Sequence, residues 1–240
     1  MKILVLDVGG TNLKALATGK RERRKVASGP TMTARGMVAA AKKLSCDWSY
    51  DAVSIGYPGP VLHGRPVAEP KNLGGGWVGF DFRKAFGKPV RLVNDAAMQA
   101  LGSYAGGRML FLGLGTGLGS ALVDGDLLEP MELAHLPYKK GRTYEDYVGR
   151  RGLEKLGKKR WRKAVADVVD RLATALDVDY VVLGGGNAKL LRPLPKGARL
   201  GDNANAFRGG FLLWKDAAKR ARPRRKRQGP SRRGRRRRTA

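Results

Sequence analysis

One short pattern occurs near the start of each half of the chain: an apolar run, a glycine-rich turn and a second apolar run. In the first half the runs are residues 2–6 and 13–17, and in the second half they are 109–114 and 120–123. Short apolar runs bounded by glycine favour strands joined by tight turns. The repeat therefore predicts two similar α/β lobes with a cleft between them.

The segments between these units complete a mixed α/β pattern. Helices are predicted at 34–44, 96–104, 144–176 and 206–219, and further strands at 52–55, 90–93 and 180–183. The charged cluster at 20–25 is expected at the exposed tip of a turn. We expect an N-terminal lobe over 1–105, a C-terminal lobe over 106–205, a terminal helix over 206–218 and a basic tail over 219–240.

The chain is strongly basic, with 48 Lys+Arg against 20 Asp+Glu and a net charge of +28 over 240 residues. Residues 219–238 hold 13 of the basic side chains and no acid, which leaves +15 on the rest of the chain. The tail has too few apolar side chains to offset the entropy of ordering, so we expect it to be disordered. Nucleic acid, polyphosphate and acidic membrane surfaces are all candidate polyanion partners.

Several classes of protein are disfavoured by the composition. The apolar N-terminal run is interrupted by Asp7, unlike a secretory h-region, and no apolar run reaches the length of a transmembrane helix. A single cysteine, Cys46, excludes an intrachain disulfide and a Cys-rich zinc site. We therefore expect a cytoplasmic protein with no membrane partner.

The first glycine turn carries groups that suit a phosphate. Gly9 and Gly10 let the backbone approach a ligand, Thr11 offers a hydroxyl, and Lys14 offers a positive charge. Asp7, at the end of the preceding strand, could hold a hydrated Mg²⁺. The motif is not a Walker P-loop, and a plain hairpin turn explains it equally well when it is taken alone.

Two further glycine turns strengthen this interpretation. Gly115, Thr116 and Gly117 follow the second apolar unit, and a strand rather than a helix comes next, so the dinucleotide-fold context is missing. Two such turns from two lobes could hold one phosphate chain from both sides. A third turn, formed by Gly184, Gly185 and Gly186, could let a base or a phosphate lie against the backbone; a simple tight turn is the alternative.

Polar side chains at the ends of other predicted strands and turns could bind a ligand that carries hydroxyl groups. Asn94 and Asp95 end a strand, where a carboxylate can take the proton of an attacking hydroxyl. The alternative is that Asp95 merely caps the following helix. Glu132 and His135 lie on one side of a turn and could bind neighbouring sugar hydroxyls, and Glu154 could be a further hydroxyl acceptor.

Taken in order, these motifs resemble the ROK family of sugar kinases and regulators over about residues 1–214, most of all its polyphosphate/ATP glucokinases. The resemblance implies an α/β, two-lobed, actin-like (ribonuclease H-like) fold whose final helix returns to the first lobe. It implies donor-binding roles for Asp7, Gly9, Gly10, Thr11, Lys14, Gly115, Thr116, Gly117, Gly184, Gly185 and Gly186. It implies that Asp95 is the catalytic base and that Asn72, Asn94, Glu132, His135 and Glu154 contact the sugar.

The chain also departs from the family pattern. Many members bind zinc through the motif histidine and three cysteines, but residues 147–154 hold no cysteine, so zinc is not expected. Polyphosphate-using relatives also lack that site, so the donor stays open between ATP and polyphosphate. Ala134 stands where glycine is usual. The chain starts at its first strand, without the helix-turn-helix of ROK repressors.

Three hypotheses about function follow from the sequence. The first is a hexose kinase, with glucose as the expected substrate, Mg²⁺ as cofactor and a possible homodimer as in relatives. The second assigns the excess positive charge to polyphosphate as donor, against an ATP-only kinase with a solvated, nonspecific tail. The third is a non-enzymatic nucleic-acid-binding regulator, whose binding would be blind to sequence because the tail has no aromatic side chains.

Overall fold

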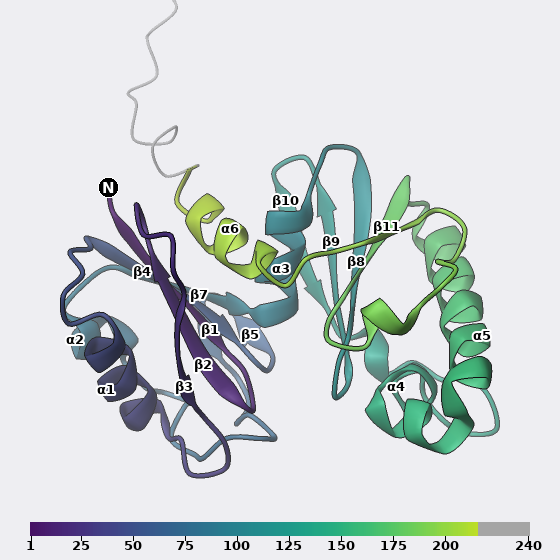
Figure 1. Cartoon of the computed structure of the whole chain (residues 1–240), viewed down its shortest axis with the longest axis horizontal. Coiled ribbons are helices and arrows are strands. Elements are labelled where there is room, and N and C mark those ends of the chain that lie inside the picture. Colours follow the sequence, from purple (N-terminus) through teal and green to yellow (C-terminus); the bar gives the residue numbers. More distant parts are fainter. Residues whose placement is uncertain (216–240) are drawn as a thin grey trace, which may run out of the picture.

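The computed structural model describes residues 1–215. It shows two lobes side by side, with helices α3 (Asp95–Ser103) and α6 (Asn205–Leu212) between them (Figure 1). The basic tail predicted at 219–240, and the last residues of the predicted terminal helix, lie outside the described residues. No helix within residues 1–215 is long and apolar enough to cross a membrane.

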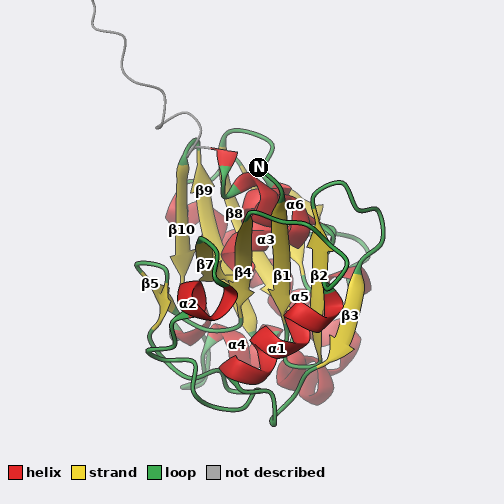
Figure 2. Cartoon of the chain, turned by 90° about the vertical axis from the view of Figure 1, so that its left-hand side faces the viewer, coloured by secondary structure: helices red, strands yellow, loops and turns green. Residues whose placement is uncertain are grey.

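The first lobe is built on a five-stranded sheet with the order β3-β2-β1-β4-β7. Its strands are β1 (Ile3–Val8), β2 (Asn12–Ala17), β3 (Arg24–Ala27), β4 (Ala52–Tyr57) and β7 (Val90–Asn94). β1 pairs antiparallel with β2 and parallel with β4. Helices α1 (Ala34–Leu44) and α2 (Phe82–Phe86) lie in front of the sheet in Figure 2, on its outer face. A small hairpin, β5 (Val61–Leu62) and β6 (Arg65–Pro66), lies apart from the sheet.

The second lobe repeats this topology with the order β10-β9-β8-β11-β12. Its strands are β8 (Arg108–Leu114), β9 (Leu118–Asp124), β10 (Leu127–Met131), β11 (Tyr180–Gly184) and β12 (Ala198–Leu200). Again one central strand, β8, has an antiparallel neighbour, β9, and a parallel one, β11. Helices α4 (Tyr144–Val148) and α5 (Arg150–Leu176), with short 3₁₀ turns η1 (Leu133–His135) and η2 (Ala188–Leu190), complete the lobe. The predicted two-lobed α/β fold with duplicated lobes is confirmed.

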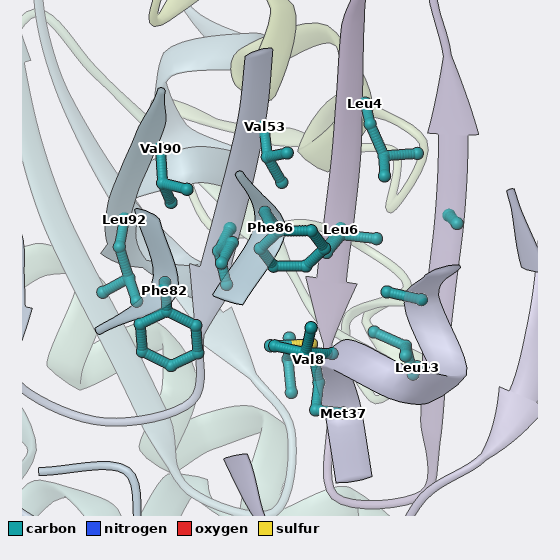
Figure 3. Close-up of a cluster of buried hydrophobic side chains, with 14 of the residues drawn as sticks. Leu4, Leu6, Val8, Leu13, Met37, Val53, Phe82, Phe86, Val90 and Leu92 are labelled. Carbon is teal, nitrogen blue, oxygen red and sulfur yellow. The ribbon is translucent and has the colours of Figure 1, made fainter. Parts of the chain in front are cut away.

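Strand β1 is buried along its whole length because both faces of its sheet are covered. Leu4, Leu6 and Val8 pack with α1 and α2 in the outer core (Figure 3), and Ile3 and Val5 pack toward α6. Side chains alternate along a strand, so Asp7 shares the face of Ile3 and Val5. The alternation thus directs this carboxylate toward the other lobe.

The two central helices touch each other backbone to backbone. A Cβ added to Gly102 of α3 would come 1.8 Å from the Asn205 carbonyl oxygen, and one added to Gly209 of α6 would come 1.8 Å from the Met98 carbonyl oxygen. Alanines on the opposite side of α3 pack against the second sheet. The hydroxyl of Ser54 in β4 donates to the Gly210 carbonyl oxygen at 2.6 Å, which fixes α6 to the first sheet.

Two predicted segments differ from the structure. The helical stretch predicted at 144–176 is divided into α4 and α5 at Gly149, whose backbone is extended, and α5 is kinked at Gly157, whose φ is +70°. The charged cluster at 20–25 is only partly a turn tip, because Arg24 and Lys25 begin the edge strand β3. Arg24 pairs with Asp47, and its guanidinium lies 4.3 Å from the ring centroid of Trp48, which holds the strand against the end of α1.

Candidate active site

A cavity of about 580 Å³ lies between the lobes and brings together predicted residues from both. From the first lobe it is lined by Gly9, Gly10, Asn72, Asn94 and Asp95, and from the second by Gly115, Thr116, Gly117, Glu132, His135 and Gly185. The other predicted residues, Asp7, Thr11, Lys14, Glu154, Gly184 and Gly186, do not line it. The glycine turns of the two lobes therefore face one space.

Asp95 is the first residue of α3 and lies on the cavity wall. The N-cap of this helix is Asn94, whose side-chain oxygen accepts from the Ala96 and Ala97 N–H groups at 2.9 and 3.2 Å. Asn94 rather than Asp95 is therefore the N-cap residue, although the Asp95 carboxylate also accepts from the Ala96 N–H at 2.8 Å. Asn94 also donates to the Gly59 carbonyl oxygen at 3.0 Å, so its predicted contact with a sugar stays a prediction.

The surroundings of Asp95 favour its protonated form. Burial, followed by the negative charge of Asp7, raises the pKa of the Asp95 carboxyl to about 7; the Ala96 N–H opposes this shift, and the charge of Glu132 adds a smaller contribution. Burial and like charges both disfavour an ionised carboxylate. A group with a pKa close to neutral can both accept and release a proton at physiological pH, as a general base must.

The first glycine turn is supported from two neighbouring strands. Its Gly9 N–H donates to the Asn12 carbonyl oxygen at 3.1 Å, and the Ser28 hydroxyl donates to the Gly9 carbonyl oxygen at 2.5 Å. Asp7 and Lys14 lie opposite each other in the β1–β2 register and form an ion pair at 2.8 Å. The predicted phosphate cation is thus already paired in this structure.

The second and third glycine turns are joined to each other. The Asn187 side chain donates to the Gly115 carbonyl oxygen at 3.1 Å, and its backbone N–H donates to the Leu114 carbonyl oxygen at 3.0 Å. Gly185 has a φ of +82°, and a Cβ there would come 2.4 Å from the Leu114 oxygen, so only glycine fits. Asn187 does not itself line the cavity, but it supports both turns, and sequence reasoning missed it.

Only some of the Glu and His side chains predicted to bind sugar line the cavity. Glu132 and His135 line the cavity on η1, with 3.8 Å between His135 Nε2 and Glu132 Oε2, and both are well exposed. Glu154 is exposed on α5 and lies outside the cavity lining, so its role stays a prediction. Glu145 of α4, which was not predicted, does line the cavity and accepts from the Leu118 N–H at 3.1 Å.

The two ends of the loop that carries Asn72 are joined by hydrogen bonds. The Glu69 carboxylate, which lines the cavity, accepts from the Trp77 N–H at 3.1 Å and from the Val78 N–H at 3.0 Å. Trp77 is fully buried and donates its indole N–H to the Gly74 carbonyl oxygen at 2.6 Å. A Cβ on Gly10 would meet the Asn72 Cβ at 2.9 Å, so this loop packs directly on the first glycine turn.

In the described part of the chain, the site offers only isolated carboxylates as metal ligands. Within residues 1–215 no three His, Cys, Asp or Glu side chains are grouped as a metal site. A hydrated Mg²⁺ that is shared with substrate phosphates needs only one or two protein carboxylates. Asp7 does not line the cavity and is ion-paired with Lys14, so the outer-shell role predicted for it stays a prediction.

A second cavity, of about 840 Å³, lies along the edge strand β7 and beside the β5–β6 hairpin. Its lining includes three arginines, one histidine and one acid, namely Arg65, Arg83, Arg91, His63 and Asp81. Arg91 lies over the Trp214 ring, 4.6 Å from its centroid, and donates to the Leu213 carbonyl oxygen. The described chain therefore ends beside a basic surface.

Comparison with known sequences gives a glucokinase and a bifunctional enzyme. The chain is 27% identical over 203 residues to the polyphosphate glucokinase of Mycobacterium tuberculosis, with 75% of this chain and 76% of that protein covered. It is 32% identical over 143 residues to the bifunctional enzyme NanE/NanK of Brucella melitensis, which is 52% of this chain but only 27% of that protein. No family model matches the sequence.

Comparison with solved structures again gives sugar kinases. The inorganic polyphosphate/ATP-glucomannokinase of an Arthrobacter species superimposes with a TM-score of 0.74 at 22% identity, covering 88% of this chain and 97% of that one. A ROK family glucokinase from Streptomyces griseus, solved with glucose and AMPPNP, gives a TM-score of 0.69 at 18% identity and covers 89% and 99%. These structures show the fold. The chain therefore has the fold of ROK family sugar kinases of known structure, and its sequence is similar to that of a polyphosphate glucokinase.

Proposed function

We propose that this protein is a hexose kinase that phosphorylates the primary hydroxyl of a sugar, with Asp95 as general base. The observation that carries the proposal is the position of Asp95, whose pKa is raised to about 7, on a cavity wall that it shares with the glycine turns of both lobes. The acceptor hydroxyl would lie between this carboxylate and the donor's terminal phosphate. Glucose is the expected sugar, in keeping with relatives that are named glucokinases.

The chemistry of such a step needs little beyond positioning and charge. The hydroxyl oxygen of the sugar forms a bond to the terminal phosphorus while the bond from that phosphorus to the donor's bridging oxygen breaks. Asp95 takes the hydroxyl proton. The donor leaves as ADP, or as a polyphosphate chain one unit shorter. A hydrated Mg²⁺ held by Asp7 would neutralise charge on the donor phosphates when it is bound.

We propose polyphosphate, alongside ATP, as a phosphoryl donor. The proposal is supported by the net charge of +28, by the basic cavity beside β7 and by relatives whose names include polyphosphate. A chain of phosphates can contact many Lys and Arg side chains at once, whereas ATP can contact few. Parallel assays with both donors, on glucose, mannose and N-acetylmannosamine, would identify the donor and the acceptor.

The substitution Asp95→Asn tests the base directly. It keeps the shape of the side chain but removes the proton acceptor, so transfer from either donor should fall by at least about 100-fold. The circular dichroism spectrum should match that of the unmodified protein, which shows that the variant is folded. Near-normal turnover by a folded Asp95→Asn variant would overturn the assignment, and a wild-type protein that phosphorylates no sugar in the panel would overturn the proposed function.

A further inference from the structure

Phosphoryl transfer needs positive charge close to the group in transit, because negative charge spreads over its oxygens in the transition state. The sequence offers Lys14 for this role. In the structure, however, the Lys14 ammonium is 2.8 Å from the Asp7 carboxylate, and Lys14 does not line the cavity between the lobes. The charge of Lys14 is therefore largely offset by its neighbour.

Lys71, unlike Lys14, lies at the cavity between the lobes. It lines the cavity, and no other lysine or arginine of residues 1–215 does so. Four carboxylates share the lining, those of Glu69, Asp95, Glu132 and Glu145. In the described part of the chain, no carboxylate lies within ion-pair distance of the Lys71 ammonium. Its positive charge is therefore available to an anionic ligand.

The backbone around Lys71 is fixed close to the first glycine turn. Its neighbour Asn72 packs on Gly10, where an added Cβ would come within 2.9 Å. The ends of the loop are joined by hydrogen bonds from the Trp77 and Val78 N–H groups to Glu69. Lys71 thus combines an anchored backbone with an exposed side chain.

We propose that Lys71 is the cation that contacts the phosphoryl group as it passes from donor to sugar, in place of Lys14. This inference rests on the proposed kinase function and assigns a further catalytic residue to the same site. The Lys71 ammonium would donate hydrogen bonds to the non-bridging oxygens of the terminal phosphate, whose charge grows during transfer. Lys14 would instead hold Asp7 in place across the β1–β2 pair.

Steady-state kinetics of the full-length protein test the proposal. Lys71→Ala should lower kcat by about 100-fold with both donors, the usual cost of removing one transition-state hydrogen-bond donor, with a smaller change in the KM of the sugar. Lys71→Arg should restore part of the loss, because it restores the charge. Lys43→Ala, on the exposed face of α1, is the matched control and should leave kcat unchanged.

A binding measurement separates this proposal from the kinase assignment. Calorimetric titration with tripolyphosphate should show weaker binding, by about tenfold, for Lys71→Ala and no change for Lys43→Ala, whether or not any sugar is phosphorylated. The proposal is overturned if a folded Lys71→Ala variant keeps more than half of the wild-type kcat. It is also overturned if tripolyphosphate binding is unchanged in that variant.

Discussion

Asp95 illustrates how neighbours determine the chemistry of a single side chain. It stands at the first turn of α3, a position at which a carboxylate would ordinarily be stabilised by the helix dipole. Burial and the charges of Asp7 and Glu132 outweigh that effect and raise its pKa to about 7. Such a shift costs folding free energy at neutral pH, and its presence in a cavity is typical of a functional group.

The pH dependence of the reaction should follow this carboxyl. Only ionised Asp95 can accept the proton, so kcat/KM for the sugar should rise with pH and level off, with a midpoint near pH 7. Asp7→Asn removes one of the causes and should move the midpoint to lower pH, whereas Glu22→Gln, in an exposed turn, should not. A midpoint close to pH 4 in the unmodified protein would contradict the assignment.

The contribution of Asp95 to the free energy of unfolding should fall as pH rises, whereas kcat/KM should rise. The folded protein binds the Asp95 proton more tightly than the unfolded chain does, because the folded pKa of about 7 exceeds the reference value of about 3.9. The stability gained from this proton is present at low pH and is lost as pH rises through 7. Relative to wild type, the melting temperature of Asp95→Asn should therefore increase between pH 5 and pH 8. A difference that stays constant over this range would show that the carboxyl is not perturbed.

Site residues could be predicted from sequence where a local pattern marks them. Glycine turns after apolar runs and a carboxylate at a strand end are such patterns, and Gly10, Gly115 and Asp95 line the cavity as expected. Glu69, Glu145 and Asn187 were missed because their partners are backbone groups distant in sequence or within irregular loops. Such contacts leave no signal of spacing in the sequence.

Helices and strands could be predicted where capping residues and the spacing of apolar residues agree with the burial that the structure shows. Helix α1 has the predicted limits, Ala34–Leu44, because Thr33 caps its start and its apolar residues recur at helical spacing. The strands β3, β10 and β12 were missed, since all three are short, largely exposed edge strands with little apolar alternation. Their existence depends on pairing with a neighbouring strand rather than on their own residues.

The contact between α3 and α6 gives a prediction at the level of elements. Replacing glycine by alanine inside a helix ordinarily stabilises a protein by about 1 kcal/mol. Gly209→Ala should do the reverse, because its Cβ would lie 1.8 Å from the Met98 carbonyl oxygen and the helices would have to separate. A loss of about 2 kcal/mol corresponds to a melting temperature lower by roughly 4–8 °C.

The same substitution should affect catalysis, since Met98 and Asp95 belong to one helix. A shift of α3 would move the Asp95 carboxylate relative to the glycine turns, so kcat should fall together with stability. Arg208→Ala, on the exposed side of α6, is the matched control and should change neither quantity. Thermal denaturation and steady-state assays of both variants measure the effect. If Gly209→Ala is as stable as wild type, the two helices do not meet as described.

At the scale of the whole molecule, duplication explains why the fold was predictable. Each lobe places an antiparallel hairpin beside parallel strands, so a glycine turn arises at the equivalent point of each sheet. The packing of α3 and α6 between the sheets makes the two turns face one cavity. The packing of the lobes on the shared helices depends on close glycine contacts such as that of Gly102, which no local pattern reveals.

The uneven distribution of charge gives a prediction for the whole chain. A chain that ends at Trp214 keeps every lining residue of both cavities and loses the 13 basic residues of 219–238. If the tail helps to bind polyphosphate, this truncation should raise the KM for long-chain polyphosphate several-fold and reduce its dependence on salt, because fewer counterions are released on binding. The KM for ATP should change little, since ATP carries too few charges to reach both the cavity and the tail.

Parallel titrations from about 50 to 200 mM salt, with both donors and both chain lengths, measure this difference. Equal salt slopes for the full and shortened chains would assign the polyphosphate contacts to the folded lobes, where the three arginines beside β7 are the candidates. In that case Arg65→Ala with Arg83→Ala, rather than truncation, should weaken polyphosphate binding. A KM for polyphosphate that responds to neither change would mean that the excess charge serves another polyanion.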